Sequence, residues 1–387
     1  MQTAIFYLND LPLLLVIFEC LMLVILLLVM NHGNAQSNLF LALFLIAVGL
    51  DAFDTLIYWN PNIKTIFLTQ FVQIFFVLKF SVYLNAPMLY LYTKSIVYSD
   101  YKFTRREWLH LLPLALSPFY LGLFYYSLGD AEIYHVAQDY NALFNTVLFQ
   151  GHLWARNIVY VLYGTMSYQL LVHYNECLKE NYSNIEKIDH SWLRLLIVGF
   201  IAIWIWNFAG YILDLVLDPV WLPDTMGIIG NYFNFIFINT LVLYSLTHSN
   251  LYKGVQSSAE EQKNSDLEVT DPRHIAILVK AMEEDKFFLA PDITLEQLAD
   301  HVSLSARQVS NIINRHFNKN FFEYVNSYRV EQAKQLLSQV DNSRSIMDVM
   351  ADAGFNSKSV FHRYFKKIVN MTPREFRDSV LKKQNIK

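Results

Sequence analysis

Seven long apolar segments occupy most of the first two thirds of the chain and restrict what it can fold into. A run of about 20 mostly apolar residues is long enough to cross the hydrocarbon core of a bilayer as a helix. The runs lie at 11–30, 39–58, 70–92, 109–127, 152–173, 192–217 and 226–247. The first run has no Lys or Arg before it and is too long for the core of a signal peptide, so we expect a retained helix. The sequence therefore predicts a seven-helix transmembrane bundle over residues 1–248.

Basic residues are distributed unequally over the connections between these segments. If the amino terminus is outside, the inner connections carry Lys94, Lys102, Arg105, Arg106, Lys179 and Lys187, with Lys253 just past the last segment. The outer connections carry only Lys64. Because Lys and Arg that flank membrane helices are retained on the cytoplasmic side, we expect a multi-pass membrane protein with its amino terminus outside and its carboxyl-terminal domain in the cytoplasm.

Ionisable residues also lie inside the predicted spans, and the predicted orientation places them all in the outer half of the membrane. They are Glu19, Asp51, Asp54, Lys79, Arg156 and Asp214. A charged side chain in a span is costly and usually faces a bundle interior or a water-filled cavity. Two interpretations stay open. The six residues form interhelical ion pairs that hold the bundle together, or they form a sensor cluster in a ligand pocket, whose ligand the sequence does not name.

The composition changes after the last apolar segment. Residues 249–271 are polar and without periodicity, which is typical of a flexible linker. Residues 272–387 are charged and helix-patterned, and residues 291–387 carry 15 Lys and Arg against 10 Asp and Glu. The chain has 2 Cys, too few for a disulfide framework. We therefore expect a second domain, over 272–387, with a partner different from that of the first.

Residues 294–317 have the pattern of a helix-turn-helix unit. Thr294 is a candidate N-cap for a short helix. After a brief turn, Ser305 caps a second helix with Gln308 at the capping-box position. The polar face of this second helix includes Arg307, Gln308, Ser310, Asn311 and Arg315. Since Arg can pair bidentately with guanine, and Asn or Gln with adenine, this face suits the reading of base edges in double-stranded DNA.

The same arrangement recurs 51 residues later, at 345–369. Ser345 begins the first helix of this second unit, and Ser357 caps the second helix. The outward face of that helix carries Lys358, Ser359, His362 and Arg363. A long helix at 321–339 links the two units, and Thr372–Pro373 begins a closing helix. The whole chain is thus predicted to be all-α: a seven-helix transmembrane bundle followed by an all-helical domain with two helix-turn-helix units.

These segments resemble the AraC/XylS family of bacterial transcription regulators. The resemblance is carried by ITLEQLA at 293–299, FEYVNSYR at 322–329, GFNSKSVFHRYFKK at 354–367 and TPREFR at 372–377. It covers about 270–383 and implies two recognition helices that enter successive major grooves of DNA. By position, Arg307, Ser310 and Asn311 fall on the family's base-contacting sites in the first unit, and Lys358, Ser359, His362 and Arg363 do so in the second. The membrane half is similar to membrane-embedded regulators only in general hydropathy.

Asn318 and Asn370 depart from the family pattern, in which glycine follows each recognition helix. Asn is the next-best residue for a left-handed helix end, so we expect both turns to be kept. Met350 replaces a small alanine, which puts the packing of the second unit in doubt.

The pattern indicates a membrane-anchored transcription regulator of a bacterial inner membrane that converts an unknown signal into sequence-specific DNA binding. The alternative is a transporter or receptor-like membrane protein whose carboxyl-terminal domain docks a partner. We expect no enzyme, because the sequence has no phosphate-binding glycine loop or nucleotide motif. No metal or other cofactor is expected either, since His301, His316 and His362 have no Cys or His partners at ligand spacing. Two recognition helices per chain let a monomer cover a DNA site, so a homodimer is left open.

Overall fold

The computed structural model describes residues 6–30, 35–72, 75–98, 101–144, 146–185, 191–217, 222–247, 271–339 and 344–384. Over these residues the chain is all-helical, as expected, and contains no β-strand beyond an isolated antiparallel bridge between Tyr182 and Thr294. The contacts divide the chain into two compact units. One is Met1–Val172 with His190–Ser257, and the other is His173–Asp189 with Ser258–Lys387. The predicted linker at 249–271 lies outside the described residues except for Asp271.

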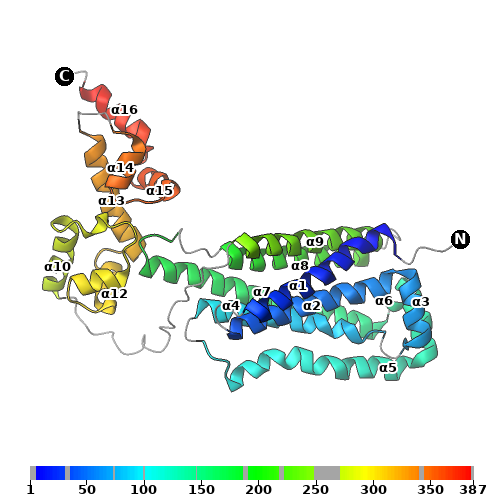
Figure 1. The fold of residues 1–387 in the computed structure, drawn as a ribbon. Helices are drawn as coiled ribbons and strands as arrows, with labels where there is room; N and C mark the ends of the chain where they lie inside the picture. The colour runs from blue at the N-terminus through cyan, green and yellow to red at the C-terminus, as the bar shows by residue number, and fades with distance from the viewer. Residues whose placement is uncertain are drawn as a thin grey trace. The chain divides into compact units, whose positions relative to one another are not determined.

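The first unit contains a bundle of long helices (Figure 1). Its elements are η1 (Leu8–Asp10), α1 (Leu11–Met30), α2 (Ala35–Trp59), α3 (Pro61–Gln70), η3 (Val77–Ser81), α4 (Val82–Val97), η4 (Arg105–Leu111), α5 (Leu112–Gln138), α6 (Tyr140–Phe144), α7 (Val147–Asn181), α8 (Ser191–Leu217) and α9 (Leu222–Thr247). Helix α1 packs against α2 and α9, α8 packs against α9, and α2 packs against α4. The last residues of α7 belong to the second unit.

Five helices in the described part of the chain are long and apolar enough to cross a membrane. They span Leu8–Val29, Ala35–Trp59, Arg105–Gly129, Ser191–Val216 and Asp224–Tyr244. These helices match five of the seven predicted spans by length and composition.

Of the two remaining predicted spans, one differs from the prediction and the other is a less apolar part of a long helix. The expected single helix over 70–92 is wrong, because α3 ends at Gln70, a 3-10 helix covers Val77–Ser81, and α4 begins only at Val82. With 16 residues, α4 is about 24 Å long at 1.5 Å per residue, shorter than a hydrocarbon core of about 30 Å. The segment 152–173 lies inside α7, which has 35 residues. Its polar side chains, among them His152, Arg156 and Asn157, reduce its hydropathy.

The described part of the second unit contains eight further helices. One of them, α13, is long and central, and the others lie before and after it in the chain (Figure 1). They are α10 (Pro272–Glu283), η6 (Phe287–Leu289), α11 (Leu295–His301), α12 (Ala306–Arg315), α13 (Phe321–Leu337), α14 (Ile346–Asp352), α15 (Lys358–Val369) and α16 (Pro373–Gln384). Helix α13 contributes to two hydrophobic cores. Tyr324 and Val325 pack with residues of α10 to α12, and Val330 and Ala333 pack with residues of α14 and α15.

Local hydrogen bonds determine where the short helices of this unit begin. Ser305 caps α12 in a capping box with Gln308, as predicted, and Ser345 and Asp348 form the corresponding box at α14. Ser357 caps α15 by accepting a hydrogen bond from Val360 N. Each box satisfies backbone N–H groups that have no partner inside the helix.

The turns that follow the polar helices are kept despite the missing glycines. Asn318 and Asn370 have φ angles of 50° and 59°, in the left-handed region that asparagine tolerates best after glycine. The expectation for both turns is confirmed. Met350 is buried in the second core, so the larger side chain is accommodated there.

Candidate nucleic-acid interface

Helices α11 and α12 form a tight pair that exposes one polar face. Val309, Ile312 and Ile313 of α12 are buried against α11 and α13. Because residues three and four apart share a helix face, these three residues form the buried face, and the polar residues of α12 lie on the other face. Arg307 and Arg315 are exposed, whereas Gln308, Ser310 and Asn311 are half-buried.

Two of the predicted base-reading side chains of α12 already have partners. The side-chain oxygen of Gln308 accepts hydrogen bonds from the N–H and the hydroxyl of Ser305, at 3.0 and 2.9 Å. Gln308 can therefore offer a ligand only its amide N–H donors. The Ser310 hydroxyl accepts a hydrogen bond from Asn314 Nδ2 at 3.3 Å.

Helices α14 and α15 form a second pair with the same design. Phe361 and Phe365 of α15 are fully buried, and Val360 is also buried. The opposite face exposes Lys358, Ser359 and Arg363, with His362 half-buried beside them. A shallow hollow lined by Asn356, Ser357, Lys358, Ser359 and His362 lies at the amino end of α15.

A buried arginine on α13 ties the segment before the first pair to the turn of the second pair. Arg329 is 1% exposed and donates hydrogen bonds to Phe288 O at 2.9 Å, Ala290 O at 2.8 Å and Pro291 O at 3.1 Å. Its guanidinium also lies over the Phe355 ring, 5.8 Å from the centroid. Burial lowers the pKa of Arg329 to about 10, so the group stays charged at neutral pH. Several hydrogen bonds to carbonyls are what a buried charge requires.

Gly354 lets the turn of the second pair approach the same segment. Its φ of 84° lies in the left-handed region, and a Cβ there would come within 2.7 Å of Phe288 O and 2.9 Å of Leu289 Cα. The neighbouring Asn356 donates a hydrogen bond to Asp292 Oδ1 at 2.5 Å. The segment 288–292 is therefore the place where the two helix pairs meet. We call it the junction.

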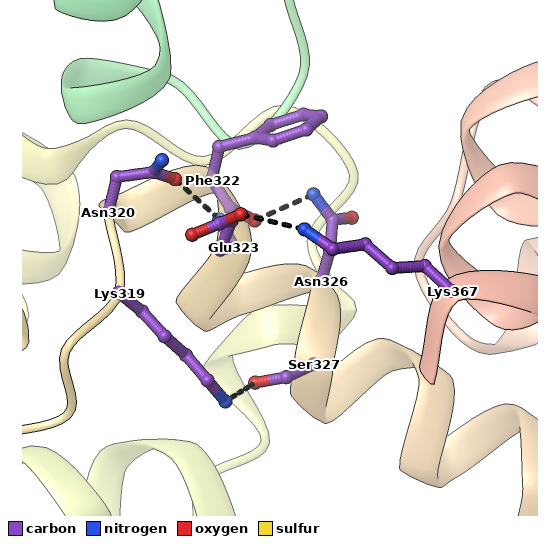
Figure 2. A network of polar contacts seen from close by, with 7 residues as sticks. All are labelled: Lys319, Asn320, Phe322, Glu323, Asn326, Ser327 and Lys367. Carbon is purple, nitrogen blue, oxygen red and sulfur yellow. Dashed lines mark hydrogen bonds and ion pairs between the residues drawn. The ribbon is translucent and has the colours of Figure 1, made fainter. Parts of the chain in front are cut away.

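Another part of α13 forms an ion pair with the second helix pair. Figure 2 shows Glu323 at the start of this helix, where Lys367 of α15 reaches its carboxylate with an N–O distance of 2.9 Å. In the same view Asn320 caps α13 at the backbone N–H of Glu323, and Lys319 donates to the hydroxyl of Ser327. The Glu323–Lys367 pair joins α15 directly to the central helix.

The sequence did not point to Arg329 and Gly354, the residues that contact the junction. Arg329 belongs to the FEYVNSYR motif, but an isolated Arg or Gly in a helical pattern gives no sign that it is buried. Gly354 was the available signal, because a glycine at a predicted helix-turn-helix turn indicates a close approach or a positive φ.

The ionisable residues predicted in the spans fall into one group and two separate sites in the first unit. Lys79 of η3 forms an ion pair with Asp54 of α2 at 2.7 Å. Asp51, one turn earlier on α2, interacts electrostatically with Asp54, Lys79 and Arg156 of α7. Elsewhere, Glu19 of α1 accepts a hydrogen bond from Asn239 of α9 at 3.1 Å, and Asp214 is buried on α8.

A small internal cavity of about 60 Å³ lies beside the Asp51 group. Besides Asp51, its polar lining residues are Thr55, Asn85, Tyr160, Trp204, Asn207, Asn231 and Asn234. The six residues predicted from the sequence are all ionisable, and these asparagines are not among them. Asparagines inside apolar runs were the signal that could have found them, because an amide in a span also needs hydrogen-bond partners.

The described residues contain no group of three or more His, Cys, Asp or Glu side chains that could hold a metal ion.

Comparison with known proteins identifies the carboxyl-terminal part of the chain. A family model described as a helix-turn-helix domain matches residues 298–379. The melibiose operon regulatory protein of Escherichia coli K12 is 34% identical over 85 residues, 22% of this chain and 28% of that protein. The xylose operon regulatory protein of Haemophilus influenzae is 29% identical over 109 residues, 28% of this chain and 27% of that protein.

A third relative is the regulatory protein PocR of Salmonella typhimurium, 29% identical over 107 residues, which are 28% of this chain and 35% of that protein. The chain thus spans about a third or less of the length of these curated relatives. No solved structure matches the chain significantly. The relatives are regulators of the AraC/XylS family, and none of the comparisons indicates a catalytic family. Residues 298–379 therefore form a helix-turn-helix domain of the AraC/XylS type.

Proposed function

We propose that the protein is a membrane-anchored one-component transcription regulator, with a multi-pass sensor unit in a bacterial inner membrane and a cytoplasmic domain that binds specific DNA. The observation that carries the proposal is the pair of exposed polar faces on α12 and α15, mounted on one central helix. These helices are the recognition helices of two helix-turn-helix units. The five apolar helices of the first unit support the membrane anchor.

The two faces suit different parts of a DNA site. Arg307 and Asn311 on α12 supply the bidentate donors and acceptors that read guanine and adenine edges in the major groove. On α15, Arg363 supplies a second guanine reader, and Lys358 lies in the first turn of the helix, where it can contact phosphate. Residues 291–387 carry a net excess of 5 basic residues, 15 against 10. Binding should therefore weaken as salt rises.

The first unit is the sensor in this proposal. The Lys79–Asp54 pair, Asp51 and Arg156 lie together next to a polar cavity, so a change in hydration or ligand at this place would alter the charges that hold α2, η3 and α7. A cavity of about 60 Å³ has room for a few water molecules at most. In the absence of a rearrangement, the cavity therefore suits a small polar signal better than a large ligand.

A transporter or receptor-like protein whose carboxyl-terminal domain docks a partner is the alternative. It would not require two exposed polar faces that each carry an Arg, and specific DNA binding tests it directly.

The test is selection of a DNA site from a random library by the full chain in lipid nanodiscs. We expect a site with two half-sites about 10–11 base pairs apart, the spacing of successive major grooves. Arg363→Ala should lower affinity for the selected site about tenfold or more, since a bidentate Arg–guanine contact discriminates by about 1–3 kcal/mol, with little effect on random DNA.

Arg307→Ala should affect the other half-site. The matched control is Arg273→Ala, because Arg273 is an exposed arginine on α10, outside both helix pairs. Selection of no site by the parent chain, or an equal effect of Arg273→Ala, would contradict the proposal.

A further inference from the structure

We infer that residues 182–185 are the coupling element that transmits the state of α7 to the DNA-binding helices, by docking on the junction and holding the two helix-turn-helix units at one spacing. The inference rests on the proposed function, and it assigns regulation to a short internal segment in place of the polar linker at 249–271. The segment belongs to the same compact unit as the DNA-binding helices.

The segment is held mainly by its backbone and by two short polar side chains. Tyr182 forms an antiparallel bridge with Thr294, and Ser183 N donates to Ile293 O at 3.1 Å. Asn184 Nδ2 donates to Asp292 Oδ1 at 3.0 Å. Ser183 is 1% exposed and Asn184 9% exposed. Residues 182–184 thus add a strand-like pairing to the stretch that leads into α11.

Residues of α13 contact the segment from the other side. Asn326 Nδ2 donates to Ser183 O at 3.3 Å, and Arg329 Nη2 donates to Ser183 Oγ at 3.4 Å. Ile185 packs against the core that α13 forms with α14 and α15. The segment therefore contacts the entrance to the first helix pair, the central helix and the core of the second pair.

Asp292 connects the segment to the second recognition helix. The same Oδ1 atom that accepts from Asn184 also accepts from Asn356, which precedes α15. Docking of the segment thus constrains the start of α11 and, through Asp292, the turn before α15. The hydrogen bonds of residues 183–184 go to the stretch before α11 and to α13, and Arg307, Lys358 and Arg363 on the two polar faces stay exposed while the segment is docked.

Three side chains of the domain that contact the segment keep other hydrogen bonds when it is released. Without the segment, Asn326 Nδ2 still donates to Phe322 O at 2.8 Å, Arg329 still binds Ala290 O and Pro291 O, and Asp292 still binds Asn356. The groups of Ser183 and Asn184 would return to water. An interface whose two states both satisfy their hydrogen bonds is suited to switching, because an unpaired buried group would make one state costly.

Helix α7 leads directly into this segment. It runs without a break from Val147 to Asn181, and Tyr182 N continues its hydrogen bonding to Leu178 O at 2.9 Å. The same helix carries Arg156 and Tyr160 beside the cavity of the first unit. In this inference, a signal that reaches α7 is passed along the helix to the docking segment.

The experiment compares a loosened and a matched variant of the full chain in nanodiscs, using the DNA site selected by the parent. Asn184→Ala/Ile185→Ala removes the Asp292 contact and the apolar packing. Asn181→Ala is the control, because its side-chain amide donates to Cys177 O of its own helix at 2.7 Å. We expect the double variant to bind the site about tenfold more weakly and to tolerate one inserted base pair between the half-sites better than the parent, since the spacing is no longer pre-organised. The control should match the parent.

Equal or tighter binding by the double variant, with unchanged spacing preference, would overturn the inference while the parent's specific binding left the proposed function intact. A parent chain that selects no site would overturn both. If the double variant is missing from the membrane, disulfide cross-linking in a Cys177→Ser background tests the docking instead. Asn184→Cys/Asp292→Cys should form a cross-link on oxidation in native membranes. Asn181→Cys/Asp292→Cys should not. Absence of the first cross-link, or equal yields, would contradict docking.

Discussion

At the scale of single residues, Gly354 shows how a backbone requirement and a packing requirement coincide. The turn needs a positive φ, and the close approach to Phe288 and Leu289 leaves no room for a Cβ. The corresponding turn of the first pair uses Ser303 at φ 56°. A side chain is thus tolerated in one turn and excluded from the other.

Gly354→Ala should therefore destabilise the second helix pair by more than the cost of a left-handed residue alone, which is about 1 kcal/mol. Ser303→Ala is the matched control, since it removes a hydroxyl from a left-handed position without adding a clash. Hydrogen exchange of α14 and α15 in the full chain should accelerate for Gly354→Ala and stay near the parent rate for Ser303→Ala. Unchanged protection in the Gly354 variant would contradict the packing account.

Local sequence patterns predicted the helix caps of the second unit but not the contacts at its junction. Caps such as Ser305 and Ser357 could be predicted because their partners lie three residues away in the chain. Arg329 and Asp292 could not, because their roles depend on contacts with residues about 40 and 60 positions away. Nothing in the local spacing of a sequence specifies such pairs.

At the scale of elements, the capping boxes decide whether the short helices are formed. Helix α14 has only 7 residues, so its first turn contributes a large share of its hydrogen bonding. The hydrogen bond from Ser345 lowers the pKa of Asp348. A lowered folded-state pKa means that this contribution is complete above the ordinary aspartate pKa of about 4 and is lost as the pH falls through the folded-state value.

Ser345→Ala should weaken α14 by about 1 kcal/mol. Faster hydrogen exchange at the start of α14, with α12 unchanged, is the expected readout at neutral pH. Ser379→Ala in α16 is the control, because its hydroxyl bonds Phe376 O within a helix and caps nothing. Equal exchange in the Ser345 variant and the parent would mean that tertiary packing alone forms this helix.

The Lys79–Asp54 pair tests whether the charges of the bundle are structural or sensory. Removing one partner of a buried pair leaves an uncompensated charge and costs about 3–5 kcal/mol in a protein interior. If the pair is structural, Lys79→Met should lower the amount of protein in the membrane, and Lys79→Met/Asp54→Leu should restore much of it. Lys102→Met, at an exposed lysine of an inner connection, should leave the amount unchanged.

The sensor hypothesis predicts a different result for the same variants. Lys79→Met would then accumulate normally but give a fixed reporter output under inducing and non-inducing conditions. A normal amount together with a normal response would remove Lys79 from both accounts.

At the scale of the whole molecule, hydropathy predicted the all-helical first unit and five of its long helices, but not the helix boundaries within 70–92. The run at 70–92 is mostly apolar, yet α4 begins only at Val82. Composition measures only whether a segment tolerates lipid, and the helix boundary depends on packing of η3 against α2 and α5. The grouping of residues 173–189 with the second unit also lay beyond any composition argument.

Orientation is the whole-molecule property that the basic residues predict. Reporter fusions ending after Val136 and after Tyr182 should report the outside and the cytoplasm, respectively. The same compartment for both fusions would contradict the predicted topology, and reversed compartments would place the helix-turn-helix domain away from DNA.

The central claim is that a chain anchored in the membrane reads DNA through both α12 and α15. Genome-wide mapping of DNA bound by the full chain, beside an Arg307→Ala/Arg363→Ala variant of equal membrane abundance, tests it most directly. We predict discrete sites for the parent, each with two half-motifs about one helical turn apart, and loss of these sites in the variant. No discrete sites for the parent, or the same sites in both maps, would contradict the claim.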